Sequence, residues 1–414
     1  MKDRLYIFFI ATYFAQGMIG IAYVPISYLL KEVLALNAAQ SAAFIVWMTL
    51  PFLFKPLLGI ITDALPLARR RRVPYLLMSA AATTAGWLVL AGMPGYSYWP
   101  TLALLTTVNI GIAFADVLCD GVMVEHGKRL RKTGFYQAAQ IGTLYATLLA
   151  TGVGGGWLAA HASYRTVFLL TALFPMIIFA SSFVVREEPT AEPERQAQLL
   201  RDGVTRLLSQ RSFWAACVVI LLFNFNPFQG TAFFYYQTDA LGFPKLLVGS
   251  LTSIEGVAGV AGAALFWRFY NRSVTIAGRA VRLDTGTLIR YSVLTGAPLT
   301  LLYLGYRTPA TAVALTAFLG VVNVAMRLSL MDLVAKACPE HGEATAFAVF
   351  MGVFNLAAWS SNMSGGRLYD TLTVSRLGPH GAMAVLIAIS AACTLACWPV
   401  LRWLESPQPQ GAAS

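Results

Sequence analysis

The chain has 414 residues, of which 57% are hydrophobic and only 12% are charged, and its mean hydropathy is +0.64. A soluble protein of this length does not need so many apolar residues, so the composition excludes a water-soluble globular protein and indicates an integral membrane protein. The formal net charge of +11 would suggest nucleic-acid binding in a soluble protein, whereas in a membrane protein it bears on topology.

Apolar runs of about 20 residues, the length of helix that crosses a hydrocarbon layer of about 30 Å, recur along the whole chain. They are uninterrupted rather than alternating, which favours helices over the strands of a β-barrel. We predict an all-α membrane protein with twelve spans, over residues 5–30, 39–62, 74–93, 98–126, 134–160, 163–186, 212–239, 244–270, 287–306, 308–337, 344–372 and 379–404.

Lysine and arginine are unevenly distributed between the two sides of this topology. The side that holds both termini carries 22 of them, the opposite side carries five, and three lie within spans. Because loops rich in Lys and Arg remain in the cytoplasm, we predict a multi-pass protein of the cell or bacterial inner membrane with both termini cytoplasmic. Four consecutive arginines, Arg69 to Arg72, anchor the loop after the second span.

The longest polar segment, Arg186 to Arg211, follows the sixth span and predicts a cytoplasmic linker. We therefore expect a six-helix bundle over 1–186, a linker over 187–211 and a second six-helix bundle over 212–414. Short motifs recur in corresponding spans, such as "FAQG" at Phe14–Gly17 and "FQG" at Phe228–Gly230. Two related halves favour the major facilitator fold, in which two bundles rock around a central cavity.

Ionisable side chains inside the spans are the first candidates for function, because each costs at least about 2.5 kcal/mol in the membrane centre unless it faces a partner or water. The predicted spans contain Lys55, Asp116, Asp120, Glu255, Arg327, Asp332 and Arg367. Asn109, Asp116 and Asp120 share one face of the fourth span, and we expect that face to line the cavity. Lys55 lies between Pro51 and Pro56, which predict a broken helix.

Other interpretations of these residues remain open. Asp120 would equally suit a salt bridge with Lys128 or the arginine cluster, and Lys55 a position where its side chain reaches to the interface. Glu255 has no basic residue within a helical turn and is a candidate proton carrier, or else a glutamate hydrogen bonded between helices. Arg327 has no acidic partner on its own helical face, so its guanidinium awaits a carboxylate from elsewhere or from the substrate.

Several motifs in order carry a resemblance to a known family. They are "YFAQG" at Tyr13–Gly17, "LLKEVLAL" at Leu29–Leu36, "PFLFKPLLGIITDALPL" at Pro51–Leu67, "ADVLCDGVMVE" at Ala115–Glu125 and "CPEHGEATAFA" at Cys338–Ala348. Over most of its length the chain resembles the folate-biopterin transporter family of the major facilitator superfamily, although Phe52 stands where that family usually has tryptophan.

The resemblance implies a secondary transporter of a folate-like or pterin-like molecule that works by alternating access. It also implies that the loop after the second span is a gate, with Asp63 as its aspartate and Arg71 or Arg72 as its arginine, and that Lys55 belongs to the substrate cavity.

We expect a heterocyclic substrate to meet amide side chains and tyrosine faces in that cavity. The predicted substrate-binding residues are Gln16, Lys55, Asn109, Asp116, Asp120, Asn224, Gln229, Asn323 and Arg327, with Tyr23, Tyr235 and Tyr236 for stacking. We predict proton coupling through Asp116, Asp120 or Glu255, so the expected partners are the small-molecule substrate, protons and the lipid bilayer.

The alternative within transport is a major facilitator porter for another solute, such as a muropeptide, a sugar conjugate or a drug. An enzyme is disfavoured, because the four histidines lie in loops or at span ends without a metal-binding spacing such as HExxH. We expect no catalytic residue, cofactor or metal, and no nucleic-acid partner.

Overall fold

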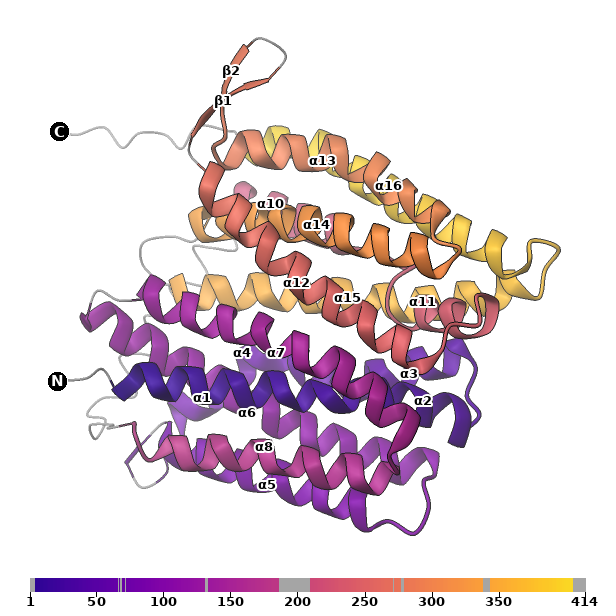
Figure 1. Ribbon diagram of the computed structural model, residues 1–414. Helices are drawn as coiled ribbons and strands as arrows, with labels where there is room; N and C mark the ends of the chain where they lie inside the picture. Colours follow the sequence, from indigo (N-terminus) through magenta and orange to yellow (C-terminus); the bar gives the residue numbers. More distant parts are fainter. Residues whose placement is uncertain are drawn as a thin grey trace, which may run out of the picture.

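The computed structural model describes residues 4–65, 67, 69, 70, 72–130, 133–185, 209–270, 272–276, 279–337 and 343–404. This part of the chain is helical apart from one small hairpin (Figure 1). In the N-terminal half the helices are α1 (Arg4–Ile19), η1 (Gly20–Ala22), α2 (Tyr23–Tyr28), η2 (Leu29–Val33), α3 (Ala38–Thr49), η3 (Leu50–Phe54), α4 (Lys55–Ala64), α5 (Val73–Gly92), α6 (Tyr98–Leu130), α7 (Thr133–His161) and α8 (Tyr164–Ser182).

The C-terminal half contains a second set of helices and the hairpin. Its elements are α10 (Arg211–Asn224), α11 (Thr231–Tyr235), η4 (Tyr236–Ala240), α12 (Lys245–Phe269), β1 (Ser273–Ile276), β2 (Arg279–Arg282), α13 (Thr285–Leu301), η5 (Leu302–Gly305), α14 (Pro309–Ala337), α15 (Glu343–Thr373) and α16 (Gly378–Leu404). Strands β1 and β2 pair antiparallel and project from the bundle between α12 and α13 (Figure 1).

Each predicted span coincides with one helix or with a run of consecutive helices. Within the described residues, nine helical segments are long and apolar enough to cross a membrane. The other three predicted spans correspond to α7, to the run from α10 to η4, and to α15, so for these three the membrane crossing stays a prediction.

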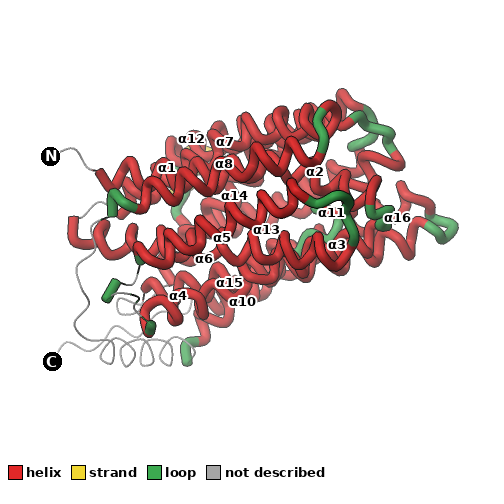
Figure 2. Tube along the Cα trace, turned by 90° about the horizontal axis from the view of Figure 1, so that it is seen from below, coloured by secondary structure: helices red, strands yellow, loops and turns green. Residues whose placement is uncertain are grey.

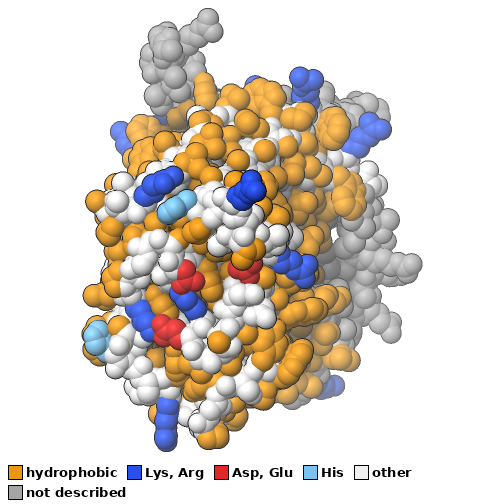
Figure 3. All heavy atoms as spheres, turned by 90° about the vertical axis from the view of Figure 1, so that its right-hand side faces the viewer, with side chains coloured by type: hydrophobic (Ala, Val, Ile, Leu, Met, Phe, Trp, Pro, Cys, Tyr) orange, Lys and Arg blue, Asp and Glu red, His pale blue; other side chains and the backbone are white. Residues whose placement is uncertain are grey.

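The helices run lengthwise beside one another, and the two halves form two layers (Figures 1 and 2). Helix α1 begins and α16 ends at one end of the molecule, which we call the termini end; it lies on the left of Figure 1. The short connections at 34–37, 93–97, 162–163, 241–244, 306–308 and 374–377 lie at the opposite end, the far end. Figure 3 views the far end and shows charged side chains near its middle, with hydrophobic side chains around them.

Two of the long spans are interrupted. The break predicted from Pro51 and Pro56 is confirmed, because a 3-10 turn at Leu50–Phe54 separates α3 from α4. The seventh predicted span, over residues 212–239, is also interrupted: α10 ends at Asn224 and α11 begins only at Thr231. Gly230 ends this break with φ of 69°, in the left-handed region that favours glycine.

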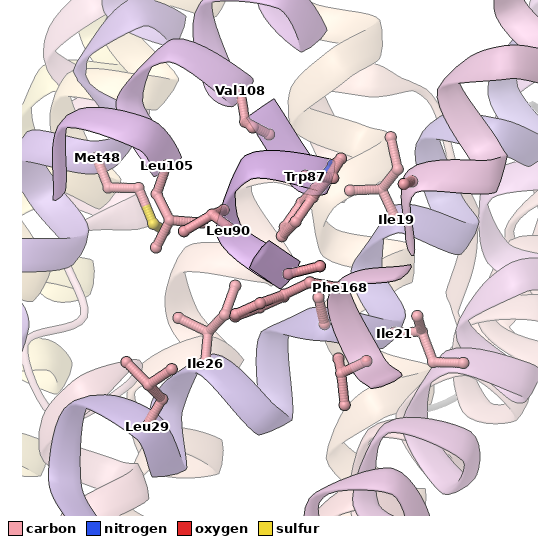
Figure 4. Close-up of a cluster of buried hydrophobic side chains, with 14 of the residues drawn as sticks. Ile19, Ile21, Ile26, Leu29, Met48, Trp87, Leu90, Leu105, Val108 and Phe168 are labelled. Carbon is pink, nitrogen blue, oxygen red and sulfur yellow. The ribbon is translucent and has the colours of Figure 1, made fainter. Parts of the chain in front are cut away.

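The core of the N-terminal half is made of large apolar side chains from several helices (Figure 4). Trp87 of α5 is 1% exposed, and its ring centroid lies 5.6 Å from that of the fully buried Phe168 of α8. Ile19 and Leu29 from the first span are fully buried in the same cluster. Such close packing holds helices together in lipid, where the hydrophobic effect between helices is small.

Glycines bring α7 of the N-terminal half and α12 of the C-terminal half into backbone contact. A Cβ atom added to Gly249 would lie 2.6 Å from the Cα of Gly156 and closer still to the carbonyl oxygen of Gly152. The Ser253 hydroxyl also donates to the carbonyl of Leu149 at 2.8 Å and accepts from the amide of Val153 at 2.8 Å. The two halves are therefore joined along this helix pair.

Candidate functional site

A cavity of about 720 Å³ lies between the two halves. Its walls come from α2, η2, α3 and η3 of the N-terminal half, and from α10, the break before α11, α11, α14 and α15 of the C-terminal half. This volume falls in the range of roughly 300 to 1,000 Å³ that is typical of sites for small organic ligands. Both interrupted spans contribute to it, so the irregular backbone lies where it borders a cavity rather than lipid.

Three asparagines lining the cavity have their amide orientation fixed by the backbone. The Nδ2 atom donates to the carbonyl of Ile220 in Asn224 (2.8 Å), of Phe223 in Asn226 (3.3 Å) and of Phe52 in Asn355 (2.9 Å). A carbonyl only accepts, so the amide nitrogen must face it, and the Oδ1 atom is left for another donor. The cavity wall therefore presents hydrogen-bond acceptors.

Aromatic rings form much of the remaining wall. Phe52, Phe234, Tyr235, Phe354 and Trp359 all line the cavity, which suits a flat ring system. The indole Nε1 of Trp359 is buried and has no hydrogen-bond partner within the described part of the chain. An orphaned donor of this kind is costly, so it favours a ligand or water molecule as its partner.

Arg327 of α14 is the one charged side chain among the described residues that line the cavity. It is exposed to the cavity, and no ion pair joins it to a carboxylate of the described residues. The N–H donors of its guanidinium are therefore available to an anionic ligand.

A second polar cluster lies beside the cavity within the N-terminal half. Lys55 of α4 forms an ion pair with Asp116 of α6, and the Tyr13 hydroxyl of α1 donates to Asp120 Oδ1 at 2.8 Å. The Lys55 Nζ atom lies 5.0 Å from the centroid of the Phe52 ring, and Phe52 is part of the cavity wall. The cluster of Tyr13, Lys55, Asp116 and Asp120 therefore borders the cavity wall where Lys55 lies against Phe52.

Four of the residues singled out from the sequence line the cavity: Asn224, Gln229, Tyr235 and Arg327. The other predicted substrate-binding and stacking residues, together with Glu255, lie outside its lining: Gln16, Tyr23, Lys55, Asn109, Asp116, Asp120, Tyr236, Glu255 and Asn323.

Three of these outlying residues have contacts within their own half of the molecule. Asn109 is 5% exposed and donates to the carbonyl of Leu105 on its own helix. Tyr236 bonds to Nδ1 of His380 at 2.8 Å within the C-terminal half. The backbone of Glu255 in α12 lies against Gly320 of α14.

The gate predicted at the termini end is described in part. The Arg72 guanidinium lies against Gly121 of α6 and reaches the Thr62 hydroxyl of α4 at 3.4 Å, so it links the ends of two helices. Arg71 and the side chain of Asp63 lie outside the described residues.

Sequence reasoning missed four of the lining residues that matter here: Phe52, Asn226, Asn355 and Trp359. The two asparagines carried a usable signal, because an amide within an apolar span is costly unless it faces a polar partner. The two aromatic residues carried none, since such residues are common on every face of a membrane helix.

Two pseudo-symmetric contacts join the halves at the far end. Lys31 of η2 pairs with Asp239 of η4 and lies 5.5 Å from the centroid of the Tyr235 ring. Conversely, Lys245 pairs with Glu32 at 2.6 Å and lies 4.5 Å from the centroid of the Tyr28 ring. Each half therefore supplies one lysine, one carboxylate and one tyrosine to a reciprocal pair of contacts.

Further polar contacts at the far end complete this junction. The Asp370 carboxylate of α15 accepts from the backbone amide of Ala39 at 2.7 Å, at the start of α3. The Tyr235 hydroxyl donates to the carbonyl of Leu36 and is 2.8 Å from the Ser41 hydroxyl. Among the described residues, the hydrogen bonds and ion pairs between the halves lie at the far end or in the middle of the molecule.

Comparison with solved structures supports the same architecture. The nucleoside transporter NupG aligns with a TM-score of 0.68 at 12% identity, over 98% of this chain and 100% of its own. The D-xylose-proton symporter aligns with a TM-score of 0.66 at 15% identity, over 94% of this chain and 96% of its own. At these identities the likeness shows the fold, which is that of the major facilitator superfamily.

Comparison of sequences identifies the family. A folate-biopterin transporter of Synechocystis sp. is 31% identical over 420 residues, which cover 97% of this chain and 82% of that protein. Folate transporter 2 of Plasmodium falciparum is 23% identical over 83% of this chain and 76% of its own length. The model of the BT1 family matches residues 16–411. The chain thus belongs to the BT1 family, the family of the folate-biopterin transporters, and is a multi-pass membrane transporter rather than an enzyme.

Proposed function

We propose that this protein moves a folate or pterin across the cell or bacterial inner membrane by alternating access coupled to protons. The observation that carries the proposal is the cavity between the halves, whose wall combines aromatic rings with asparagine oxygens. A pterin ring is flat and carries N–H donors along one edge, so it matches both features. The relatives that share this chain's family are named as folate or folate-biopterin transporters.

Alternating access is supported by the ion pairs that join the two halves at the far end. If the termini end is cytoplasmic, as the distribution of Lys and Arg predicts, the ion pairs at the far end close the cavity toward the outside. These pairs must break when the cavity opens there, and the predicted gate of Asp63, Arg71 and Arg72 would then close the termini end.

Proton coupling is supported by the cluster beside the cavity. Lys55 neutralises Asp116 in the present arrangement, while Asp120 is held by the Tyr13 hydroxyl. If α4, which follows the 3-10 turn at Leu50–Phe54, shifts against α6 during transport and separates Lys55 from Asp116, the carboxylate loses its cation and takes up a proton, since an unpaired charge in the membrane is costly. Glu255 interacts electrostatically with Arg327 and is the second candidate for the same exchange.

The test is transport by the purified protein in liposomes. Folic acid and biopterin are offered with and without a pH gradient, and counterflow, which needs no net proton movement, is measured in parallel. Asp116→Asn is expected to keep counterflow and lose accumulation driven by the gradient. Accumulation that ignores the pH gradient would refute proton coupling, and uptake of muropeptides or sugars in place of both folic acid and biopterin would refute the substrate.

A further inference from the structure

The described lining of the central cavity carries one positive charge and no negative charge. Arg327 is the one charged residue among its described lining, and the neighbouring Lys55 is already neutralised by Asp116. Glu255 acts on Arg327 electrostatically from α12, but no ion pair forms between them. A carboxylate that enters the cavity is therefore attracted to this guanidinium, which can hold it with two parallel hydrogen bonds.

Three asparagines of the wall present acceptors in another part of the cavity. The amide nitrogens of Asn224, Asn226 and Asn355 are bonded to backbone carbonyls, so these side chains present oxygens. An oxygen acceptor repels a carboxylate and attracts an N–H group. The wall thus distinguishes two parts of one ligand, a donor-rich ring at the asparagines and an anionic group at Arg327.

We propose that this transporter is selective for ring compounds that bear a carboxylate, with Arg327 as the residue that determines the selectivity. This inference rests on the proposed function and narrows it. Folates carry a ring with N–H donors joined to glutamate carboxylates, and they satisfy both parts of the wall. Biopterin has the same ring but no carboxylate; it leaves the guanidinium with no anion to hold and is a poor substrate.

The test compares folic acid with biopterin in liposomes containing the full chain, by the KM of counterflow for each. In the unmutated protein the KM for folic acid is expected to be at least about tenfold lower than that for biopterin. Arg327→Gln should raise the folic acid KM about 10- to 100-fold and change the biopterin KM by less than about twofold. Arg327→Lys should fall between the two, because a lysine keeps the charge and loses the fork.

Arg165→Gln is the matched control, because Arg165 is an exposed arginine of α8 that does not line the cavity; neither KM should change. Continued transport of biopterin by Arg327→Gln shows that the variant is folded. If Arg327→Gln transports neither compound, the KM values of Arg327→Lys and the ratio of the two KM values in the unmutated protein decide whether Arg327 determines the selectivity.

Equal KM values for both compounds in the unmutated protein, or equal changes for both in the Arg327 variants, would overturn the selectivity and leave folate and pterin transport standing. Transport of neither compound by the unmutated protein would instead overturn the proposed function, and the selectivity with it.

Discussion

Removing Lys31 should shift the conformational equilibrium toward the state that is open at the far end. The side chain is 21% exposed, and in the present state it holds Asp239, the Thr238 hydroxyl at 2.6 Å and the face of Tyr235. An ion pair that is partly exposed, as this one is, contributes about 0.2 to 1 kcal/mol, and a cation–π contact at such a site about 0.5 to 1 kcal/mol. Lys31→Met, which keeps the apolar stem, should therefore cost the closed state about 1 to 2 kcal/mol, a change of roughly 5- to 30-fold in the ratio of the two states.

The assay is the rate at which a membrane-impermeant thiol reagent, added outside intact cells, labels a cysteine in the cavity. Ser27→Cys provides that cysteine, because Ser27 lines the cavity. When closing is fast relative to labelling, the labelling rate follows the open population, so Lys31→Met should raise it about 5- to 30-fold.

Charge exchange provides the control for this prediction. Lys31→Asp combined with Asp239→Lys restores an ion pair and should return the labelling rate close to its original value. Arg376→Gln, which removes an exposed far-end cation without a described ion pair, should leave the rate unchanged. An unchanged rate in Lys31→Met, or the same increase in Arg376→Gln, would show that the far-end pairs do not hold the cavity closed.

Three further changes test other parts of the structure. Gly249→Leu places side-chain atoms against the backbone of α7 and should lower the free energy of unfolding by the cost of overpacking, about 1 to 3 kcal/mol, which is seen as a lower unfolding temperature. Gly142→Ala, where the added Cβ meets nothing within 4 Å, should leave the unfolding temperature unchanged. Gly230→Ala forces a left-handed conformation on alanine and brings its Cβ to 2.6 Å from Asn362 Oδ1, so we expect a loss of about 1 to 2 kcal/mol in stability and reduced uptake. Arg72→Gln should slow turnover far more than it weakens substrate binding in a direct binding assay, because Arg72 bonds to Thr62 at the termini end and does not line the cavity. Weaker binding at an unchanged turnover rate would contradict a gating role.

The order of the spans and the break at Lys55 were predictable because they depend on local signals. Runs of apolar residues determine which segments cross the membrane, and the two prolines that flank Lys55 determine where the second span is interrupted. The break in the seventh span had equally local signals in Pro227 and Gly230. An apolar run of this length is also compatible with one continuous helix, so these two residues do not by themselves locate the break.

The cavity lining was less predictable, because periodicity shows which residues share a helical face but not what that face contacts. Asn109 shares a face with Asp116, yet its amide bonds to its own helix, and Asp116 faces Lys55 rather than the cavity lining. In a soluble protein the polar face of a helix is turned to water, whereas in a membrane a polar group faces either a cavity or a neighbouring helix. Partners as distant in sequence as Lys31 and Asp239 leave no local pattern.

The glycine contact between α7 and α12 has a consequence for how movement is measured. Here the two halves touch backbone to backbone, and the Ser253 hydroxyl bonds to two residues of the opposite helix. If the halves rotate about this line, points near it keep their separation and points far from it travel furthest. Spectroscopic labels placed across α7 and α12 would then report one constant distance during transport, and they would serve as an internal ruler against which labels on α3 and α15 report the opening.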